Sequence, residues 1–196
     1  MVMPINRRCP VCGENYMGGD CIKFGEVCPA CDGGLQLGMY DIIMGATNVG
    51  KSMMSIVTEF ATEKHKGQRR KNGEDYIEHP KRVGNRILQM YGMDISLFCI
   101  ALLHDTLEDT ATTKEELITK FGKEIANVVE MLSRKKDETY FDFIMRLHDR
   151  KAIRIKLADL DDNLSDLDEG SMKDKYRFAH YILEQRLEKD EAWQDD

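Results

Sequence analysis

The feature that most constrains this chain is a helical pattern of apolar residues, which persists from about residue 51 almost to the C-terminus. Apolar side chains recur at spacings of three and four, the period of an amphipathic α-helix. The stretch "TTKEE" adds threonine N-caps followed by glutamates, which is a helix start signal. No convincing strand run follows Ser52, so the sequence predicts an all-α domain. The helical segments are 53–65, 80–92, 94–110, 113–133, 139–149, 151–167 and 175–189.

A phosphate-binding loop pattern, G-x-x-x-x-G-K-S/T, is matched by "GATNVGKS" from Gly45 to Ser52. Its chemistry depends on a strand, then a glycine loop whose N–H groups hold phosphates, then a helix. A domain built on such a loop also needs a parallel sheet and an aspartate that holds magnesium. Because the helical remainder offers neither, we interpret the match as part of a linker over residues 39–51. A phosphate contact at the N-terminus of the following helix stays open.

Cysteines are concentrated at the N-terminal end, where five of the six lie within the first 31 residues. Two Cys-x-x-Cys pairs are formed by Cys9 with Cys12 and by Cys28 with Cys31. In a reducing compartment such pairs are typical of a Zn²⁺ site with four thiolate ligands, which has no open coordination position and is structural. The sequence therefore predicts a zinc-ribbon-like module over residues 1–38.

Residues 1–35 carry three cations and four anions, so this module offers no basic footprint for nucleic acid. We favour a structural role, in which zinc stabilises a segment too short to bury a core of its own, or a contact with a protein partner or a second copy of the chain. Cys21 is surplus to the four ligands and either replaces one of them or stays free. Cys99 lies in an apolar helical segment, where we expect an inert core thiol.

The net charge of −7 argues against broad, non-specific binding of nucleic acid. Positive charge is nevertheless concentrated in "KHKGQRRK", residues 64–71, which leaves room for an anionic substrate. No apolar run approaches the roughly 18 residues that a membrane span needs, and the N-terminus lacks the apolar core of a secretory signal. We therefore expect a cytoplasmic protein with no membrane partner.

The stretch "ALLHDTLEDT" ends an apolar segment with His104, Asp105, Glu108 and Asp109. A spacing of four places these groups on two adjacent stripes of a helix. Three carboxylates beside leucines are costly unless a cation lies among them, and a metal ion supplies that cation. An exposed acidic helix end without a metal is the alternative.

Two further stretches bring polar residues to the edge of the core. In "IRIKLADLDDN", Lys156, Asp159 and Asn163 share a helix face beside the buried stripe. In "GEDYIEHP", His79 precedes Pro80 at a helix start, a fixed and partly sheltered place. These residues favour the metal interpretation of the acidic helix end.

Together these motifs resemble the HD metal-dependent phosphohydrolases. The ordered set is more specific: the pattern from His65 to Pro80, then "ALLHDTLEDT", "FG" and "KLADxxxN", is similar to the hydrolase domain of RelA/SpoT-type alarmone enzymes. The likeness covers roughly residues 52–185 and is greatest to the small, hydrolase-only members. It implies an HD-domain helical bundle over residues 52–188, followed by an acidic tail over residues 189–196.

The resemblance also implies a function and a set of site residues. The reaction would remove the 3′-diphosphate from ppGpp or pppGpp, with a metal that is commonly Mn²⁺. Glu108 and Asp109 would orient or deprotonate water, or protonate the leaving 3′ oxygen. The implied metal ligands are His79, His104, Asp105 and Asp159, and the implied nucleotide contacts are Arg70, Lys71, Asn163 and Tyr176.

Departures from the family pattern leave the identity of the nucleotide substrate undecided. Asp75 replaces the proline of "GEPYI", and Leu160, Asp161 and Asp162 replace the middle of "KLADRLHN". Another nucleotide phosphate is therefore an alternative substrate. A non-catalytic alarmone sensor, and an HD protein that the zinc module targets to nucleic acid, are alternatives of other classes.

Three other histidines are not expected to hold the metal. His148 forms a second His-Asp pair with Asp149 but lacks the Glu-Asp that follows the first pair. We expect His148 and His180 to be surface or packing residues. His65 belongs to the family motif, but we expect it to cap or pack near a helix end.

Overall fold

The computed structural model describes residues 7–8, 15–16 and 52–192. By its contacts the chain divides into two compact units, Met1–Gly50 and Lys51–Asp196. In the first unit, β1 (Arg7–Arg8) pairs antiparallel with β2 (Asn15–Tyr16). The expected zinc ligands Cys9, Cys12, Cys28 and Cys31, the surplus Cys21 and the glycine loop up to Lys51 lie outside the described residues.

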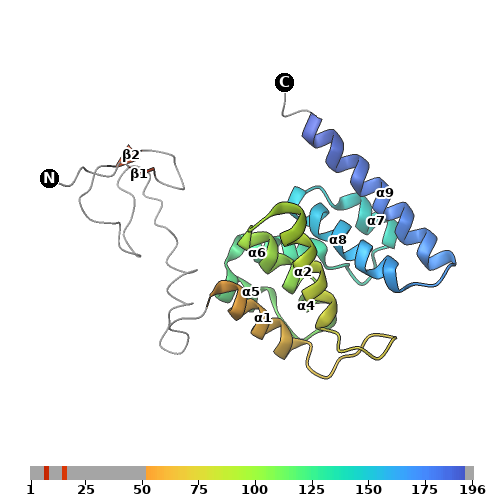
Figure 1. The fold of residues 1–196 in the computed structure, drawn as a ribbon, viewed down its shortest axis with the longest axis horizontal. Coiled ribbons are helices and arrows are strands. Elements are labelled where there is room, and N and C mark those ends of the chain that lie inside the picture. The colour runs from red at the N-terminus through yellow and green to blue at the C-terminus, as the bar shows by residue number, and fades with distance from the viewer. Residues whose placement is uncertain (1–6, 9–14, 17–51, 193–196) are drawn as a thin grey trace. The chain divides into compact units, whose positions relative to one another are not determined.

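Residues 52–192 fold into nine helices, and the prediction of a helical domain is confirmed (Figure 1). Apart from an isolated bridge between Arg69 and Asp75, these residues form no β structure. The helix α9 ends inside the stretch that the sequence assigned to an acidic tail. The helices are α1 (Met53–Lys64), α2 (Glu78–Tyr91), α3 (Ile95–Leu103), α4 (Thr106–Asp109), α5 (Lys114–Phe121), α6 (Lys123–Leu132), α7 (Tyr140–Arg146), α8 (Arg150–Asp166) and α9 (Ser171–Ala192).

Helix boundaries follow capping chemistry. Thr113 Oγ1 accepts a hydrogen bond from the backbone N–H of Glu116, so the N-cap expected in "TTKEE" is confirmed. The apolar pattern over 113–133 predicts one helix, but Gly122 divides it into α5 and α6. Gly122 has a φ of 88°, a left-handed conformation that ends a helix and that glycine adopts without strain.

The apolar pattern over 94–110 also predicts one helix, but the helix breaks after Leu103. His104 caps the C-terminus of α3, and Asp105 precedes the short helix α4. Thr106 Oγ1 donates a hydrogen bond to the carbonyl oxygen of Leu103 and so bridges the break. The turn places the histidine and the aspartate at the end of a buried helix.

The core is organised around α3, in which residues 97–103 are all buried. A helix that is apolar on every side must be covered on every side, and α3 packs against α1, α2, α6 and α8. Cys99 is fully buried here, as expected for a core thiol. The long helices α8 and α9 lie side by side (Figure 1). Within the described residues, no helix has both the length and the apolar character to cross a membrane.

Candidate functional site

Four side chains converge where the start of α2, the end of α3 and the middle of α8 meet. The ligand atoms of His79, His104 and Asp105 all lie within 4.8 Å of one another. Asp159 approaches from α8, with its Oδ1 3.1 Å from His79 Nε2 and 3.7 Å from His104 Nε2. The structure thus brings together all four residues that the resemblance implied as metal ligands.

The two imidazoles are oriented so that their Nε2 atoms face the carboxylates. His104 Nδ1 donates to the carbonyl oxygen of Ala101 at 2.8 Å, which places a proton on Nδ1. His104 Nε2 is buried and has no hydrogen-bond partner among the described residues, although Asp105 Oδ2 lies 3.1 Å away. On His79, Nδ1 lies 2.6 Å from Asp162 Oδ2. Metal-binding histidines have this arrangement, in which one nitrogen is held by an acceptor and the other is free to bind.

The electrostatics of the cluster favour a cation between the imidazoles. Burial acts to lower the pKa of His104, but Asp105 and Asp159 outweigh it and raise the pKa well above its ordinary value. The pKa of His79 is raised as well, because hydrogen bonds to Asp159 and Asp162 outweigh its burial. Two histidines and carboxylate oxygens form a donor set that suits Mn²⁺, Fe²⁺ or Zn²⁺. The residues present therefore fit a divalent metal.

Asp159 is itself held by its neighbours on α8. Lys156 Nζ lies 2.6 Å from Asp159 Oδ2, and Asn163 Nδ2 lies 2.6 Å from Asp159 Oδ1. Burial raises the pKa of Asp159, but Lys156 and the two histidines outweigh this and hold it well below its ordinary value. Asp159 is therefore ionised and fixed in orientation by two residues of the helix face that the sequence predicted the three to share.

Tyr76 links two carboxylates at the edge of the cluster. Its Oη lies 2.8 Å from Asp105 Oδ2 and 2.8 Å from Asp109 Oδ2. Burial, followed by Asp105, raises the pKa of the Tyr76 hydroxyl, so it remains a proton donor. Burial and the charge of Asp105 also raise the pKa of Asp109. A carboxyl group with a raised pKa beside a metal site is suited to proton transfer.

Glu108 lies apart from these contacts. It is exposed, and its Oε2 accepts a hydrogen bond of 2.8 Å from the backbone N–H of Arg134. No hydrogen bond or ion pair joins it to His79, His104 or Asp105 in the described part of the chain. The structure therefore places Asp109, but not Glu108, in the hydrogen-bonded network around the cluster.

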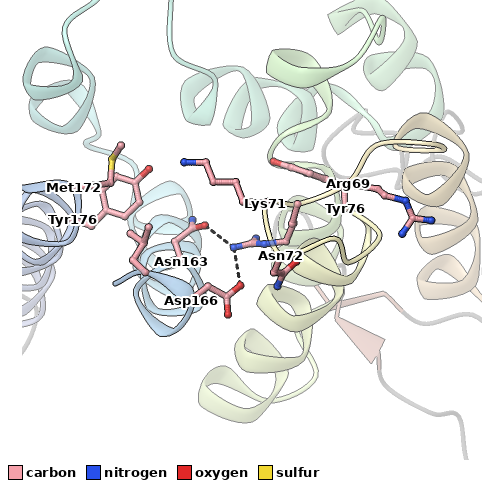
Figure 2. A pocket seen from close by; sticks show the side chains of 10 residues that line it. Arg69, Lys71, Asn72, Tyr76, Asn163, Asp166, Met172 and Tyr176 are labelled. Atoms are coloured by element: carbon pink, nitrogen blue, oxygen red, sulfur yellow. Dashed lines mark hydrogen bonds and ion pairs between the residues drawn. The ribbon is translucent and has the colours of Figure 1, made fainter. Parts of the chain in front are cut away.

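A pocket of about 300 Å³ adjoins the cluster, and Figure 2 shows its lining. Tyr76 lines this pocket and also contacts Asp105, so the pocket and the cluster share a wall. Met172 and Tyr176 of α9 form the opposite side, and Lys71 extends across the space between (Figure 2). All four residues implied as nucleotide contacts line it, namely Arg70, Lys71, Asn163 and Tyr176.

Three cations line the pocket, and two of them, Arg70 and Lys71, differ in their contacts. Arg70 Nη2 lies 3.1 Å from Asn163 Oδ1 and 3.2 Å from Asp166 Oδ2, and the side chain is only 12% exposed. Lys71 is exposed, and no carboxylate pairs with it among the described residues. Arg70 is therefore a rigid, planar wall of the pocket, whereas Lys71 carries a positive charge that an anion can reach.

The three other histidines lie outside the cluster. His148 is exposed, and its Nδ1 lies 2.9 Å from the carbonyl oxygen of Arg146. His180 Nε2 contacts Asp161 on the far side of α8 from the cluster residues. His65 caps the C-terminus of α1 and stacks on Tyr76, with 4.8 Å between ring centroids. These placements agree with the expected packing and surface roles.

Two residues of the site were not singled out as such from the sequence. Tyr76 lies three residues before His79 in the same motif, a position that alone indicated no role. Asp162 appeared only as a departure from the family pattern, yet it contacts His79 directly. Its spacing of three from Asp159 puts both on one side of α8, which is the signal that would have identified it.

Comparison with known proteins identifies the family of the helical domain. The model of the HD-domain family matches residues 58–158. A guanosine-3′,5′-bis(diphosphate) 3′-pyrophosphohydrolase of Aquifex aeolicus is 42% identical over 118 residues, which are 56% of this chain and 17% of that protein. A GTP pyrophosphokinase of Myxococcus xanthus is 34% identical over 140 residues, 64% of this chain and 18% of that protein. The chain thus spans less than a fifth of the length of these curated relatives.

A solved structure is similar to this chain over most of its own length. A metazoan orthologue of SpoT, described as hydrolysing ppGpp, superposes with a TM-score of 0.59 at 25% identity. The match covers 70% of this chain and 86% of that one. The predicted resemblance to HD proteins is confirmed, since the family model spans more than half of the sequence: this chain belongs to the HD-domain family.

Proposed function

We propose that the chain is a metal-dependent hydrolase that removes the 3′-diphosphate from ppGpp or pppGpp. The observation that carries this proposal is the shared wall at Tyr76, which joins a pocket lined by Arg70 and Lys71 to the cluster around Asp105. A nucleotide in the pocket would extend its phosphates toward the cluster. The Aquifex relative is named for this activity, and the metazoan relative is described as hydrolysing ppGpp.

The metal would be held by His79, His104, Asp105 and Asp159, and we propose Mn²⁺. A divalent ion there supplies an activated water and polarises a phosphoryl oxygen. Around it, Lys156 and Asn163 keep the Asp159 carboxylate in one orientation. Two of the four ligands are carboxylates, and carboxylate neighbours raise the pKa of the two histidines. The cluster would therefore tolerate a dication that an apolar site would reject.

The chain's own residues move the protons. Water attacks phosphorus, the bond between phosphorus and the 3′ oxygen breaks, and the leaving 3′ oxygen takes up a proton. Asp109 has a raised pKa and is oriented by Tyr76. It is therefore suited to accept a proton from the water or to donate one to the leaving 3′ oxygen. Glu108 would take the second catalytic role by orienting or deprotonating the water.

Nucleotide binding would divide between Arg70 and Lys71, two of the three cations that line the pocket. Lys71 is the cation available to a phosphate, as a point charge on a flexible stem. Arg70 is held by Asn163 and Asp166, so its planar guanidinium offers a face on which a base can stack. Asn163 would contact the ribose or a phosphate, and Tyr176 would close the far side of the pocket.

A different nucleotide phosphate is the second candidate substrate, because extra carboxylates lie near the pocket. Their charges are compensated, however. Asp75 pairs with Arg69 at 3.3 Å, and Asp161 pairs with Arg86 at 3.2 Å. Asp162 is bound by Arg82 and His79. None of these carboxylates adds an uncompensated negative charge that would repel a polyphosphate. This favours ppGpp or pppGpp as the substrate.

A turnover assay tests the proposal. The full chain is incubated with ppGpp and Mn²⁺, beside a control treated with a chelator, and the products are separated by chromatography. We expect GDP and diphosphate only where metal is present. Cleavage of another nucleotide phosphate with no action on ppGpp would establish the second candidate. Binding of ppGpp without turnover would indicate a sensor, and salt-sensitive binding of RNA or DNA would revive a nucleic-acid target.

We further propose that residues 1–38 form a structural zinc module and residues 52–188 the hydrolase domain. Cys9, Cys12, Cys28 and Cys31 would hold Zn²⁺, and the module would contact a protein partner or a second copy. Elemental analysis distinguishes the two metals. Cys28→Ser should lower bound zinc and leave bound manganese unchanged, whereas a loss of manganese alone would contradict the separation of the sites.

A further inference from the structure

We propose that Asp162 is a positioning residue that fixes His79 on the metal, in a carboxylate–histidine–metal arrangement. The inference deepens the proposed function and rests on its metal site, but not on the identity of the nucleotide. The family pattern has histidine where this chain has Asp162, so the carboxylate is a feature of this sequence. The neighbouring carboxylate of this stretch, Asp161, instead pairs with Arg86 and His180.

The contact itself has the geometry of a directed hydrogen bond. His79 Nδ1 lies 2.6 Å from Asp162 Oδ2, and both side chains are almost fully buried. A carboxylate accepts, so the proton of the imidazole stays on Nδ1 and the lone pair of Nε2 faces Asp159 and Asp105. The same bond raises the basicity of the imidazole and prevents the ring from rotating.

Two arginines contact the Asp162 carboxylate and keep it in the ionised form, which accepts the hydrogen bond from His79. Arg82 Nε lies 2.6 Å from Asp162 Oδ1, and Arg82 Nη2 lies 3.1 Å from Oδ2. Arg70 Nη1 is 3.7 Å from the same Oδ2. A buried carboxylate with such partners is ionised, and the bidentate contact with Arg82 defines the plane of the carboxylate. His79 is therefore oriented by a group that is itself fixed.

A purely structural role is the rival explanation, because Arg82 on α2 and Asp162 on α8 also join two helices. Arg82 has a second partner, Glu74, at 2.8 Å, and it touches no metal ligand. Arg82→Gln therefore removes the ion pair between the helices and keeps the carboxylate beside His79. Asp162→Asn removes the charge from His79 and keeps the size of the side chain. Each role is thus tested by its own variant: Arg82→Gln tests the packing of the two helices, and Asp162→Asn tests the positioning of His79.

The experiment measures Mn²⁺ affinity by calorimetry on the full chain without nucleotide, together with thermal unfolding. We expect Asp162→Asn to weaken Mn²⁺ binding by about 10–100-fold, the usual effect of losing such a partner, and Asp162→Glu to recover part of it. The matched control Asp161→Asn removes the neighbouring carboxylate, which pairs with Arg86 and His180, and should bind Mn²⁺ as the parent does.

Two results would overturn the proposal. One is parent-like Mn²⁺ affinity in folded Asp162→Asn. The other is an equal loss of affinity in Arg82→Gln together with an equal fall in Tm, which would assign the effect to helix packing. If Asp162→Asn does not fold, the comparison of Asp162→Glu with Arg82→Gln decides in the same way. Because no nucleotide is present, the result is independent of whether ppGpp is the substrate.

Discussion

His104 donates a hydrogen bond of 2.8 Å from Nδ1 to the carbonyl oxygen of Ala101, one turn earlier in α3. The bond fixes the imidazole at the break between α3 and α4 and leaves the buried Nε2 for a metal. We expect His104→Ala to abolish detectable Mn²⁺ binding in calorimetry, a larger loss than the ~10–100-fold of an outer partner.

His148→Ala is the matched control, because His148 is exposed and contacts only a backbone carbonyl of the described chain. It should bind Mn²⁺ as the parent does. Retained affinity in His104→Ala would remove this residue from the ligand set.

Tyr76→Phe tests the hydroxyl that joins the pocket to the cluster. The variant loses contacts to the Asp105 and Asp109 carboxylates, and a hydrogen bond to a charged group is worth about 1.5–3 kcal/mol. If that energy is expressed in the transition state, kcat should fall by about 10–100-fold with little change in KM. Steady-state kinetics on ppGpp measure both, and Tyr181→Phe on the exposed surface is the control. An unchanged kcat would mean that Tyr76 only packs.

Glu108→Gln tests the assignment of a catalytic role to a residue that lies outside the hydrogen-bonded network. Turnover should fall by at least ~100-fold, the contribution expected of a general acid or base. Bound manganese should remain, because Glu108 contacts none of the four ligands. Glu115→Gln, an exposed residue of α5, is the control. Turnover near the parent rate would leave Asp109 as the only proton-transfer residue.

Much of the fold followed from periodicity, because the apolar stripes of α1, α2 and α8 are continuous in sequence. The breaks at Leu103 and Gly122 did not follow from it, since both lie inside unbroken apolar patterns and depend on local turns. The four residues of the metal cluster came from motif resemblance, and their convergence could not be predicted from spacing. The role of Asp162 depends on a contact between α2 and α8 across 83 positions, which one helix cannot reveal.

Cys99 should be chemically silent in the folded protein. Burial raises the pKa of its thiol to about 12, with a smaller contribution from Asp94. At pH 8 the reactive thiolate is then on the order of one part in ten thousand. Alkylation followed by mass spectrometry should modify the Cys99 peptide in denaturant but not in native buffer. Native modification at pH 8 would mean that α3 opens locally.

Gly84→Ala tests the close approach of α2 to α3. A Cβ at this position would lie 2.6 Å from Leu102 Cδ2 and 3.0 Å from Phe98 Cε2, and Leu102 is fully buried. Overpacking of this kind costs about 1–3 kcal/mol, which exceeds the ~1 kcal/mol gained from the better helix propensity of alanine. We therefore expect a lower Tm by several degrees.

The exposed neighbour provides the control, because Asn85→Ala adds helix propensity without a new contact and should leave Tm unchanged or slightly higher. Since α2 carries His79 and α3 carries His104, the strain in Gly84→Ala should also separate the two imidazoles and weaken Mn²⁺ binding. A variant that is as stable as the parent and binds Mn²⁺ equally well would show that α2 and α3 can move apart without disturbing the metal cluster.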